Sequence, residues 1–272
     1  MARREDFKLG GALALVTGAG SGIGREISLA LAGHGVRLLA ADIDGDAADK
    51  TAVECGQVGP EAHGLTCDVG DAEDVARVAE RVHETWGPLD ILVNNAGVGM
   101  SSRLADMSVD DWQWIRRVNL DGVVHCCLAF GPAMLERGHG HVVNLASGLA
   151  YLPHGTEPAY VATKAAVLAL SQSLRGDWGP RGVGVSAICP GIVNTSIIDR
   201  SRFRGRQLDE RESLTKAFRR ARSPEVVARD VVRAIREDRV VVPVGWDARI
   251  GWWMHRFLPV RVQQLVARWG VK

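Results

Sequence analysis

The sequence predicts a single α/β domain built on a doubly wound parallel sheet. Short apolar runs alternate along the chain with segments of helical spacing, and a glycine-rich turn follows the first run. The runs also lack the alternation of polar and apolar residues that is typical of strands with one solvent-exposed face. Strands separated by helices pair in parallel, and continuous apolar runs are typical of strands buried on both faces. We therefore expect helices on both sides of the sheet.

Seven strands are expected along the chain, at residues 12–17, 36–41, 62–67, 89–93, 141–146, 183–188 and 240–242. Helical spacing between them predicts helices at residues 23–31, 44–54, 71–86, 108–137, 158–179 and 226–236. The last of these helices follows Ser223 and Pro224, a capping residue and a proline suited to the first helical position.

Composition limits the class of protein. A chain of 272 residues with 46% hydrophobic and 24% charged residues is typical of a soluble globular protein. The net charge of +1 argues against a nucleic-acid partner, which needs a clear basic excess. The five scattered cysteines form no C-x-x-C pair, so we expect reduced, buried thiols. Residues 1–11 lack a signal-peptide stretch and no run of about 18 apolar residues follows, which predicts a cytoplasmic protein.

A basic segment interrupts the pattern. Residues 199–222 hold eight Arg and one Lys against four acids. A connection of this length predicts a lid over the substrate at about residues 195–222. The lid is interpreted first as a solvated flap; the alternatives are a clamp for an anionic substrate or carrier and a surface that faces acidic lipid.

A C-terminal extension, residues 245–272, holds four of the eight tryptophans and several Arg residues at near-regular intervals. Pro259 is expected to divide it into two short helices. Basic residues interleaved with Trp suit a helix in a membrane interface, and they equally suit packing on the same domain or on a partner subunit. We favour packing and keep peripheral membrane contact as the alternative.

The glycine-rich turn, Thr17-Gly18-Ala19-Gly20-Ser21-Gly22-Ile23-Gly24, lies between the first strand and the first helix. Gly18, Gly22 and Gly24 let the backbone turn tightly and approach a pyrophosphate, whose charge is met by the helix N-terminus. The spacing is G-x-x-x-G-x-G, not the commoner G-x-G-x-x-G, but its position in the first βαβ unit predicts a dinucleotide site.

Asp42 lies eighteen residues after Gly24, at the end of the second expected strand. A carboxylate there accepts hydrogen bonds from both hydroxyls of the adenine ribose and repels a 2′-phosphate. Neither Ser21 nor Ile43 is a basic residue that would reverse this preference. We therefore expect NAD as the cofactor, with NADP less favoured. A helix cap or a solvated loop aspartate is the alternative interpretation of Asp42.

Tyr160 and Lys164 lie four residues apart in an expected helix, and Ser147 lies thirteen residues before Tyr160. Residues four apart are neighbours on a helix surface. An ammonium group beside a phenol favours the phenolate, so Lys164 is expected to lower the pKa of Tyr160 from its usual value of about 10. Such a phenol can exchange protons with an alcohol. Ser147 follows a buried strand, where open α/β sheets place ligands.

The chain resembles the short-chain dehydrogenase/reductase family from Leu13 to about Val244. The motifs that carry the resemblance stand in the family's order and spacing: Thr17 to Gly24, Asp68-Val69, Asn94-Asn95-Ala96-Gly97, Asn119, Ser147, Tyr160-x-x-x-Lys164 and Pro190-Gly191-x-Val193-x-Thr195. The resemblance implies a Rossmann-type sheet with strand order 3-2-1-4-5-6-7, within an NAD-binding dehydrogenase domain of residues 1–244. It also implies reversible hydride transfer between NAD(H) and a secondary alcohol or ketone.

The family's residue roles are carried over by resemblance. Tyr160 would be the catalytic acid/base, Lys164 would hold the nicotinamide ribose, Ser147 would bind the substrate oxygen, and Asn119 would hold a water that relays protons from Lys164. Cofactor contacts are implied for Gly18, Ser21, Gly22, Ile23, Gly24, Asp42, Asp68, Val69, Asn95, Ala96, Gly97, Tyr160, Lys164, Pro190, Val193 and Thr195. Asn94 stays open between a turn residue and a cofactor contact.

The expected pocket floor is largely apolar, formed by Met100, Leu149, Tyr151, Leu152, Pro153 and His154. His154 is interpreted as a pocket wall or an exposed residue rather than a second proton shuttle. The substrate is expected to be a medium to large apolar alcohol, such as a steroid, terpenoid, lipid or polyketide alcohol. No metal is expected, and the chain is expected to form a homodimer or homotetramer.

Two other functions remain open at this stage. One is a non-catalytic NAD-binding sensor or scaffold, which the complete Ser147, Tyr160 and Lys164 set disfavours. The other is an NADP-dependent ketoreductase.

Overall fold

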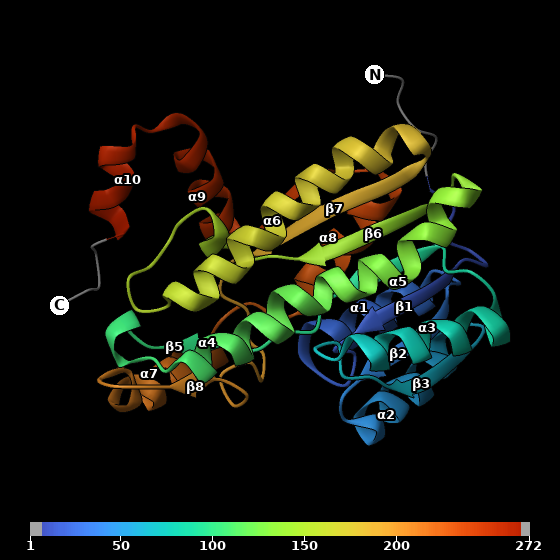
Figure 1. Ribbon diagram of the computed structural model, residues 1–272, viewed down its shortest axis with the longest axis horizontal. Coiled ribbons are helices and arrows are strands. Elements are labelled where there is room, and N and C mark those ends of the chain that lie inside the picture. Colours follow the sequence, from blue (N-terminus) through green and yellow to red (C-terminus); the bar gives the residue numbers. More distant parts are fainter. Residues whose placement is uncertain (1–6, 268–272) are drawn as a thin grey trace.

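The central sheet has seven parallel strands. The computed structural model describes residues 7–267 (Figure 1). Its strands are β1 (Leu13–Thr17), β2 (Arg37–Asp42), β3 (Ala62–Thr66), β4 (Ile91–Asn94), β6 (Gly140–Leu145), β7 (Val183–Pro190) and β9 (Val241–Val244). The order across the sheet is β3-β2-β1-β4-β6-β7-β9. Among the strands of this sheet that order is 3-2-1-4-5-6-7, so the predicted topology is confirmed.

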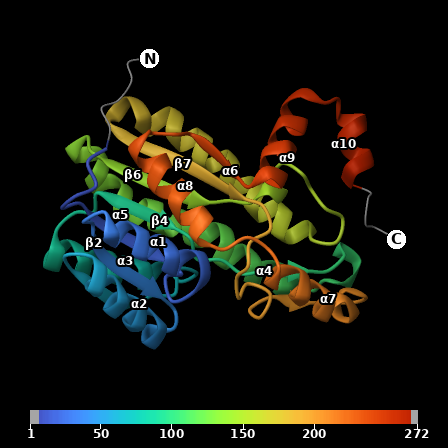
Figure 2. The ribbon, with the colours of Figure 1, turned by 180° about the vertical axis from the view of Figure 1, so that it is seen from behind.

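Helices cover both faces of the sheet. On one face lie α1 (Gly22–Gly33), α2 (Gly45–Val58) and α8 (Glu225–Arg236), seen in front in Figure 2. On the other lie α3 (Ala72–Trp86), α5 (Gly122–Arg137) and α6 (Pro158–Trp178), seen in front in Figure 1.

Strand β1 shows why its apolar run is continuous. Ala14 and Val16 belong to the first apolar layer, and Leu13 and Leu15 to the second. Successive side chains of a strand point to opposite faces, so a strand buried on both faces needs apolar residues at every position.

A long helical segment runs from α4 (Val109–Arg116) through a π-helical turn (Arg117–Asp121) into α5. By length and composition alone, residues Val109–Arg137 are long and apolar enough to cross a membrane. Phe130 and Met134 of this segment are fully buried in the protein core against α3 and the sheet. Core packing therefore accounts for a large part of its apolar character.

The substrate side of the molecule is built from short elements beyond the carboxyl ends of the strands. A second, two-stranded parallel sheet pairs β5 (Met100–Ser101) with β8 (Arg202–Phe203), and α7 (Gln207–Arg219) follows β8. Single-turn 3₁₀ helices lie at Leu104–Asp106 and Gly148–Ala150; a third, Gly179–Arg181, connects α6 to the start of β7 at the opposite end of the sheet. The basic lid is thus an ordered strand and helix connected by turns.

The C-terminal extension forms α9 (Trp246–Phe257) and α10 (Val260–Ala267), divided at Pro259 as expected. In both Figure 1 and Figure 2 these helices lie at the end of the sheet that also carries α7. The five cysteines are all buried and free, as predicted.

Candidate active site

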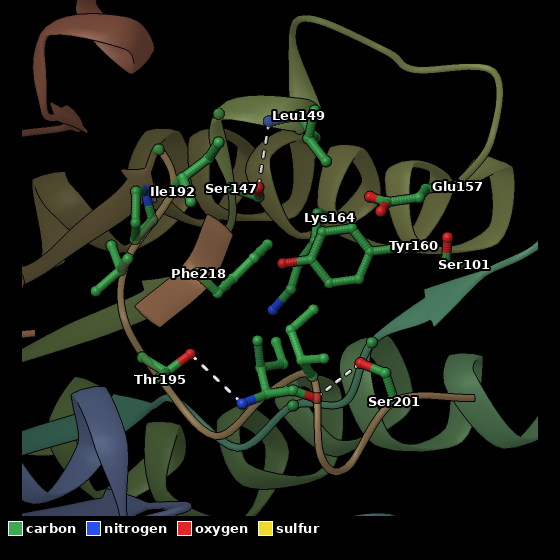
Figure 3. Close-up of a pocket in the computed structure, with 18 of the residues that line it drawn as sticks. Ser101, Ser147, Leu149, Glu157, Tyr160, Lys164, Ile192, Thr195, Ser201 and Phe218 are labelled. Carbon is green, nitrogen blue, oxygen red and sulfur yellow. Dashed lines mark hydrogen bonds between the residues drawn. The ribbon is translucent and has the colours of Figure 1, made fainter. Parts of the chain in front are cut away.

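A cavity of about 530 Å³ opens beyond the carboxyl ends of β1, β4, β6 and β7, between the lid and α9 (Figure 3). It gathers side chains that are far apart in the sequence. The expected site residues in its walls are Ser21, Gly22, Ile23, Asn95, Gly97, Ser147, Tyr160, Lys164, Pro190, Val193 and Thr195. The other expected residues, Gly18, Gly24, Asp42, Asp68, Val69, Ala96 and Asn119, lie outside these walls.

The glycine-rich turn is fastened to the end of β4. The Asn95 side chain donates hydrogen bonds to the carbonyl oxygens of Thr17 and Gly18, at 2.9 and 3.1 Å. In return, the Thr17 hydroxyl accepts hydrogen bonds from the backbone N–H groups of Asn95 and Ala96, both at 3.1 Å. Gly18 has φ of +64°, and a Cβ there would meet the Ala96 backbone at 2.8 Å. The turn therefore requires glycine at this position.

Asp42 is buried at the end of β2, directly beside the turn. One of its carboxylate oxygens accepts a hydrogen bond from the Gly20 N–H at 2.8 Å, and the other accepts one from the Asp44 N–H at 3.1 Å. The helix cap considered for Asp42 is instead Asp44, whose side chain accepts from the Ala47 N–H at the start of α2. Asp42 is thus a fixed acceptor beside the phosphate-binding turn.

Asp68 and Val69 lie after β3, next to the π-helical turn. One Asp68 oxygen accepts a hydrogen bond from the Gly70 N–H, and the other pairs with Arg117 at 3.2 Å. The Val69 carbonyl oxygen is bonded to the His125 ring at 2.9 Å. These contacts fix the loop after β3 in place.

Asn94 does not enter the pocket. Its amide donates to the Asn144 side-chain oxygen at 2.8 Å, and the Asn144 amide donates to the Ser171 hydroxyl at 3.0 Å. All three side chains are buried. They link β4, β6 and α6, so Asn94 supports the sheet from inside.

Tyr160 and Lys164 lie one turn apart on α6, facing the end of β6. The Lys164 ammonium donates a hydrogen bond to the Leu145 carbonyl at 2.8 Å and lies 5.9 Å from the centre of the Tyr160 ring. Ser147 stands opposite, and its hydroxyl accepts a hydrogen bond from the Leu149 N–H at 3.2 Å. Figure 3 shows these three side chains at the wall of one cavity.

The expected lowering of the Tyr160 pKa by Lys164 is not what the structure shows. Burial raises the pKa of Tyr160 to about 12; a polar contact with the Ser147 hydroxyl opposes this rise, and the Glu157 charge adds to it. Burial also lowers the pKa of Lys164 to about 8. The cost of removing a charge from water therefore dominates the pKa of both groups.

Asn119 is fully buried in the π-helical turn. Its side-chain oxygen accepts a hydrogen bond from the Val98 N–H at 2.8 Å, and its amide donates to the Val98 carbonyl at 2.9 Å. A Cβ on Gly97 would lie 3.3 Å from the Asn119 side-chain oxygen and 3.5 Å from the Lys164 ammonium. The side chain of Asn119 therefore positions the segment that passes beside Lys164.

The apolar floor is present in part. Met100, Leu149, Leu152 and His154 line the cavity. Tyr151 is instead buried beneath it, where its hydroxyl donates to the Ala248 carbonyl at 2.8 Å and its ring meets Trp252. His154 is half-buried and bonded to the Thr156 hydroxyl at 2.8 Å, as suits a wall residue.

Sequence reasoning missed several pocket residues. Asp247 and Ala248 of α9, Phe218 of α7 and Glu157 just before α6 all line the cavity. The Asp247 carboxylate accepts a hydrogen bond from the Ile192 N–H at 3.1 Å and pairs with Arg222 at 2.7 Å. Only Glu157 carried a signal in the sequence, since it is a charged residue three positions before Tyr160.

Comparison with known proteins decides the family. The family model for short chain dehydrogenases matches residues 12–204. The chain belongs to the short-chain dehydrogenase/reductase family. The crystal structure of a family member from Burkholderia phymatum in complex with NAD superposes with a TM-score of 0.87 at 31% identity, covering 95% of this chain and 96% of that one.

Two curated relatives are enzymes by name. The chain is 40% identical over 258 residues to the probable oxidoreductase EphD of Mycobacterium tuberculosis; the match covers 92% of this chain but 44% of EphD, so the chain spans less than half the length of that relative. It is 41% identical over 192 residues to D-threitol dehydrogenase of Mycolicibacterium smegmatis, covering 71% of this chain and 74% of that enzyme.

The residues described above fit the nicotinamide cofactor that the family implies. The glycine turn leaves the backbone open to a pyrophosphate at the N-terminus of α1, and a buried carboxylate lies beside it. The chain is thus a member of this family whose glycine-rich turn and buried carboxylate fit a nicotinamide cofactor. Within residues 7–267, no group of three or more His, Cys, Asp and Glu residues is arranged to hold a metal ion.

Proposed function

We propose that the protein catalyses reversible hydride transfer between NAD(H) and a secondary alcohol or ketone. The observation that carries the proposal is the convergence of Ser147, Tyr160 and Lys164 on one cavity beside the glycine-rich turn. The name of the threitol dehydrogenase relative supports an alcohol as the substrate. A complete catalytic set argues against the alternative of a non-catalytic sensor.

The protein's own part in the reaction is to orient the substrate and move one proton. The bound nicotinamide would supply the hydride acceptor. Ser147 holds the substrate oxygen, and Tyr160 takes the hydroxyl proton as the carbonyl forms. Lys164 holds the nicotinamide ribose and passes the proton onward. A cationic nicotinamide ring beside Tyr160 would favour the phenolate and so oppose the effect of burial.

Asp42 supports NAD over NADP. Its buried carboxylate lies where a 2′-phosphate would be repelled, and no basic side chain of the described residues is bonded to it. The mixed pocket walls, apolar at Leu149, Ile192 and Phe218, support a medium-sized or larger substrate with an apolar part.

We infer two contact surfaces, one for a second subunit and one for a membrane, from exposed apolar side chains. On the α4–α5 segment, Val109, Trp112 and Leu128 are exposed, which suits a homodimer or homotetramer contact. On the C-terminal helices, Ile250, Trp253, Phe257 and Val260 are exposed beside exposed arginines, which suits peripheral contact with an anionic membrane. Light scattering in solution would test the first assignment.

The decisive experiment replaces Tyr160 by Phe, which removes the acid/base and keeps the ring. We expect at least a thousandfold loss of kcat, because the proton has no other acceptor at that position, with the Kd for NADH within a few-fold of the wild type. NADH absorbance reports turnover of a panel of secondary alcohols, and fluorescence titration reports NADH binding. Retained turnover in the variant would contradict the proposal.

A further inference from the structure

Glu157 is a pocket residue to which the dehydrogenase chemistry gives no task. It stands at the N-cap of α6, three residues before Tyr160, and lines the same cavity. The N-cap and the third helical residue lie on the same side of the first helical turn. Figure 3 shows its carboxyl group directed over the Tyr160 ring into the cavity.

The Glu157 carboxyl has no partner within the described residues that would account for its position. It does not cap α6, and its backbone N–H is bonded to the His154 carbonyl instead. Its side chain takes part in no hydrogen bond or ion pair among residues 7–267, although it is half-buried. Because the carboxyl oxygens have no hydrogen-bond partner in the described residues, a ligand hydroxyl that donates to them adds a hydrogen bond without displacing one within the protein.

The walls around Glu157 are polar on one side. In Figure 3, Ser101 and Ser201 lie to the same side of Tyr160 as Glu157, whereas Ile192 and Phe218 lie to the other. Among the other charged groups that line the cavity, Lys164 is bonded to the Leu145 carbonyl and Asp247 is paired with Arg222, while Arg200 and Glu210 come from the lid segment. The cavity is therefore amphiphilic, with an acceptor near the reacting centre.

We infer that Glu157 is a specificity-determining residue that accepts a hydrogen bond from a second hydroxyl of the substrate, close to the carbon that is oxidised. The inference rests on the proposed alcohol dehydrogenase function and narrows it. The substrate class is an amphiphilic diol: one end carries the reacting and the neighbouring hydroxyl, and the other fills the apolar wall at Ile192 and Phe218.

The test compares 1,2-octanediol with 2-octanol, which share the chain length and the secondary hydroxyl at C2 and differ by the C1 hydroxyl. We expect the wild type to favour the diol in kcat/KM by about tenfold or more, since a hydrogen bond to a charged group is worth at least that factor. Glu157→Leu should abolish the preference, and Glu157→Gln, which keeps an acceptor without the charge, should leave an intermediate ratio. Glu80→Gln removes the same charge from the exposed face of α3, and it should leave the ratio unchanged.

A pH series separates recognition from a structural role. Burial raises the pKa of Glu157 to about 7, so its carboxyl is neutral below that pH and charged above it. The diol preference should therefore rise between about pH 6 and pH 8 in the wild type and stay flat in Glu157→Gln. The other titratable and charged groups that line the cavity are His154, Tyr160, Lys164, Arg200, Glu210 and Asp247; Glu157→Gln retains all of them and so controls for their effects.

Three results would overturn the inference. The first is wild-type turnover of 2-octanol without any diol preference, which leaves the proposed function intact. The second is a preference for 1-amino-2-octanol over the diol, which would assign an ammonium group to Glu157. The third is a wild type that binds NADH but oxidises neither these alcohols nor any secondary alcohol of the panel above, which would overturn the proposed function as well.

Discussion

The cofactor half and the substrate half of the pocket are built in different ways. On the cofactor side, the glycine turn, Asp42 and Asn95 are joined by hydrogen bonds between neighbouring strand ends. On the substrate side, the lid is held by one buried acid of α4, Asp111, which binds Arg202 and Arg204 at 3.1 and 2.8 Å. The first half is made of short motifs next to regular strands, and the second depends on contacts between distant segments.

The larger effect is expected in the cofactor half. Asp42→Ala removes the carboxylate that repels a 2′-phosphate, so the ratio of kcat/KM for NAD over NADP should fall by about tenfold or more. Initial rates with each cofactor and a single alcohol measure the ratio. Asp44→Ala is the matched control, because it removes a neighbouring acid that caps α2. A wild type that prefers NADP would refute the assignment of Asp42.

Asp111→Asn tests the substrate half. Asp111 is buried, and this burial acts to raise its pKa, but hydrogen bonds from Arg204, Ser108 and Arg202 outweigh it and hold the pKa at about 2. The variant should unfold about 2 kcal/mol more easily and raise the KM for alcohol several-fold while the Kd for NADH stays unchanged. Denaturant titration and steady-state kinetics measure the two effects. An equal loss of NADH affinity would contradict the independence of the two halves.

The contribution of Asp111 to folding stability is expected to depend on pH. Because the folded pKa of Asp111 is about 2, below the ordinary value of 3.8, its contribution to stability is present above about pH 4 and is lost as the pH falls toward 2. Asp111→Asn should therefore lose less stability than the wild type over that range. In thermal melts between pH 4 and pH 2, the difference in Tm between the wild type and Asp111→Asn should become smaller as the pH falls.

The smallest expected effect concerns the surface of α9. Trp253→Ser combined with Phe257→Ser removes two exposed aromatic side chains and leaves the buried contacts of Ala248 and Gly251 intact. Binding to phosphatidylserine vesicles should weaken several-fold with turnover of soluble alcohols retained. Val53→Ser on α2, away from both proposed contact surfaces, is the control for lost exposed apolar surface. Wild-type protein that ignores such vesicles would rule out membrane contact.

The family resemblance supplied the strand order, and the sequence by itself determined the strands of the sheet and the residues of the glycine turn. The strands and the turn are encoded locally: continuous apolar runs give strands buried on both faces, and Gly18 is required where its backbone meets Ala96. The four-residue spacing of Tyr160 and Lys164 likewise placed both on one face of α6. Periodicity and turn chemistry carry this information within a few residues.

The tertiary structure alone decided how the phenol titrates and what surrounds the substrate. Spacing predicted a lowered pKa for Tyr160, but burial, a property of the whole cavity, raises it. The wall formed by Phe218, Asp247 and Ala248 comes from segments that only the folded chain brings to β6 and β7. Only the folded structure shows that no described residue bonds to the carboxyl of Glu157, because this requires the positions of all its neighbours.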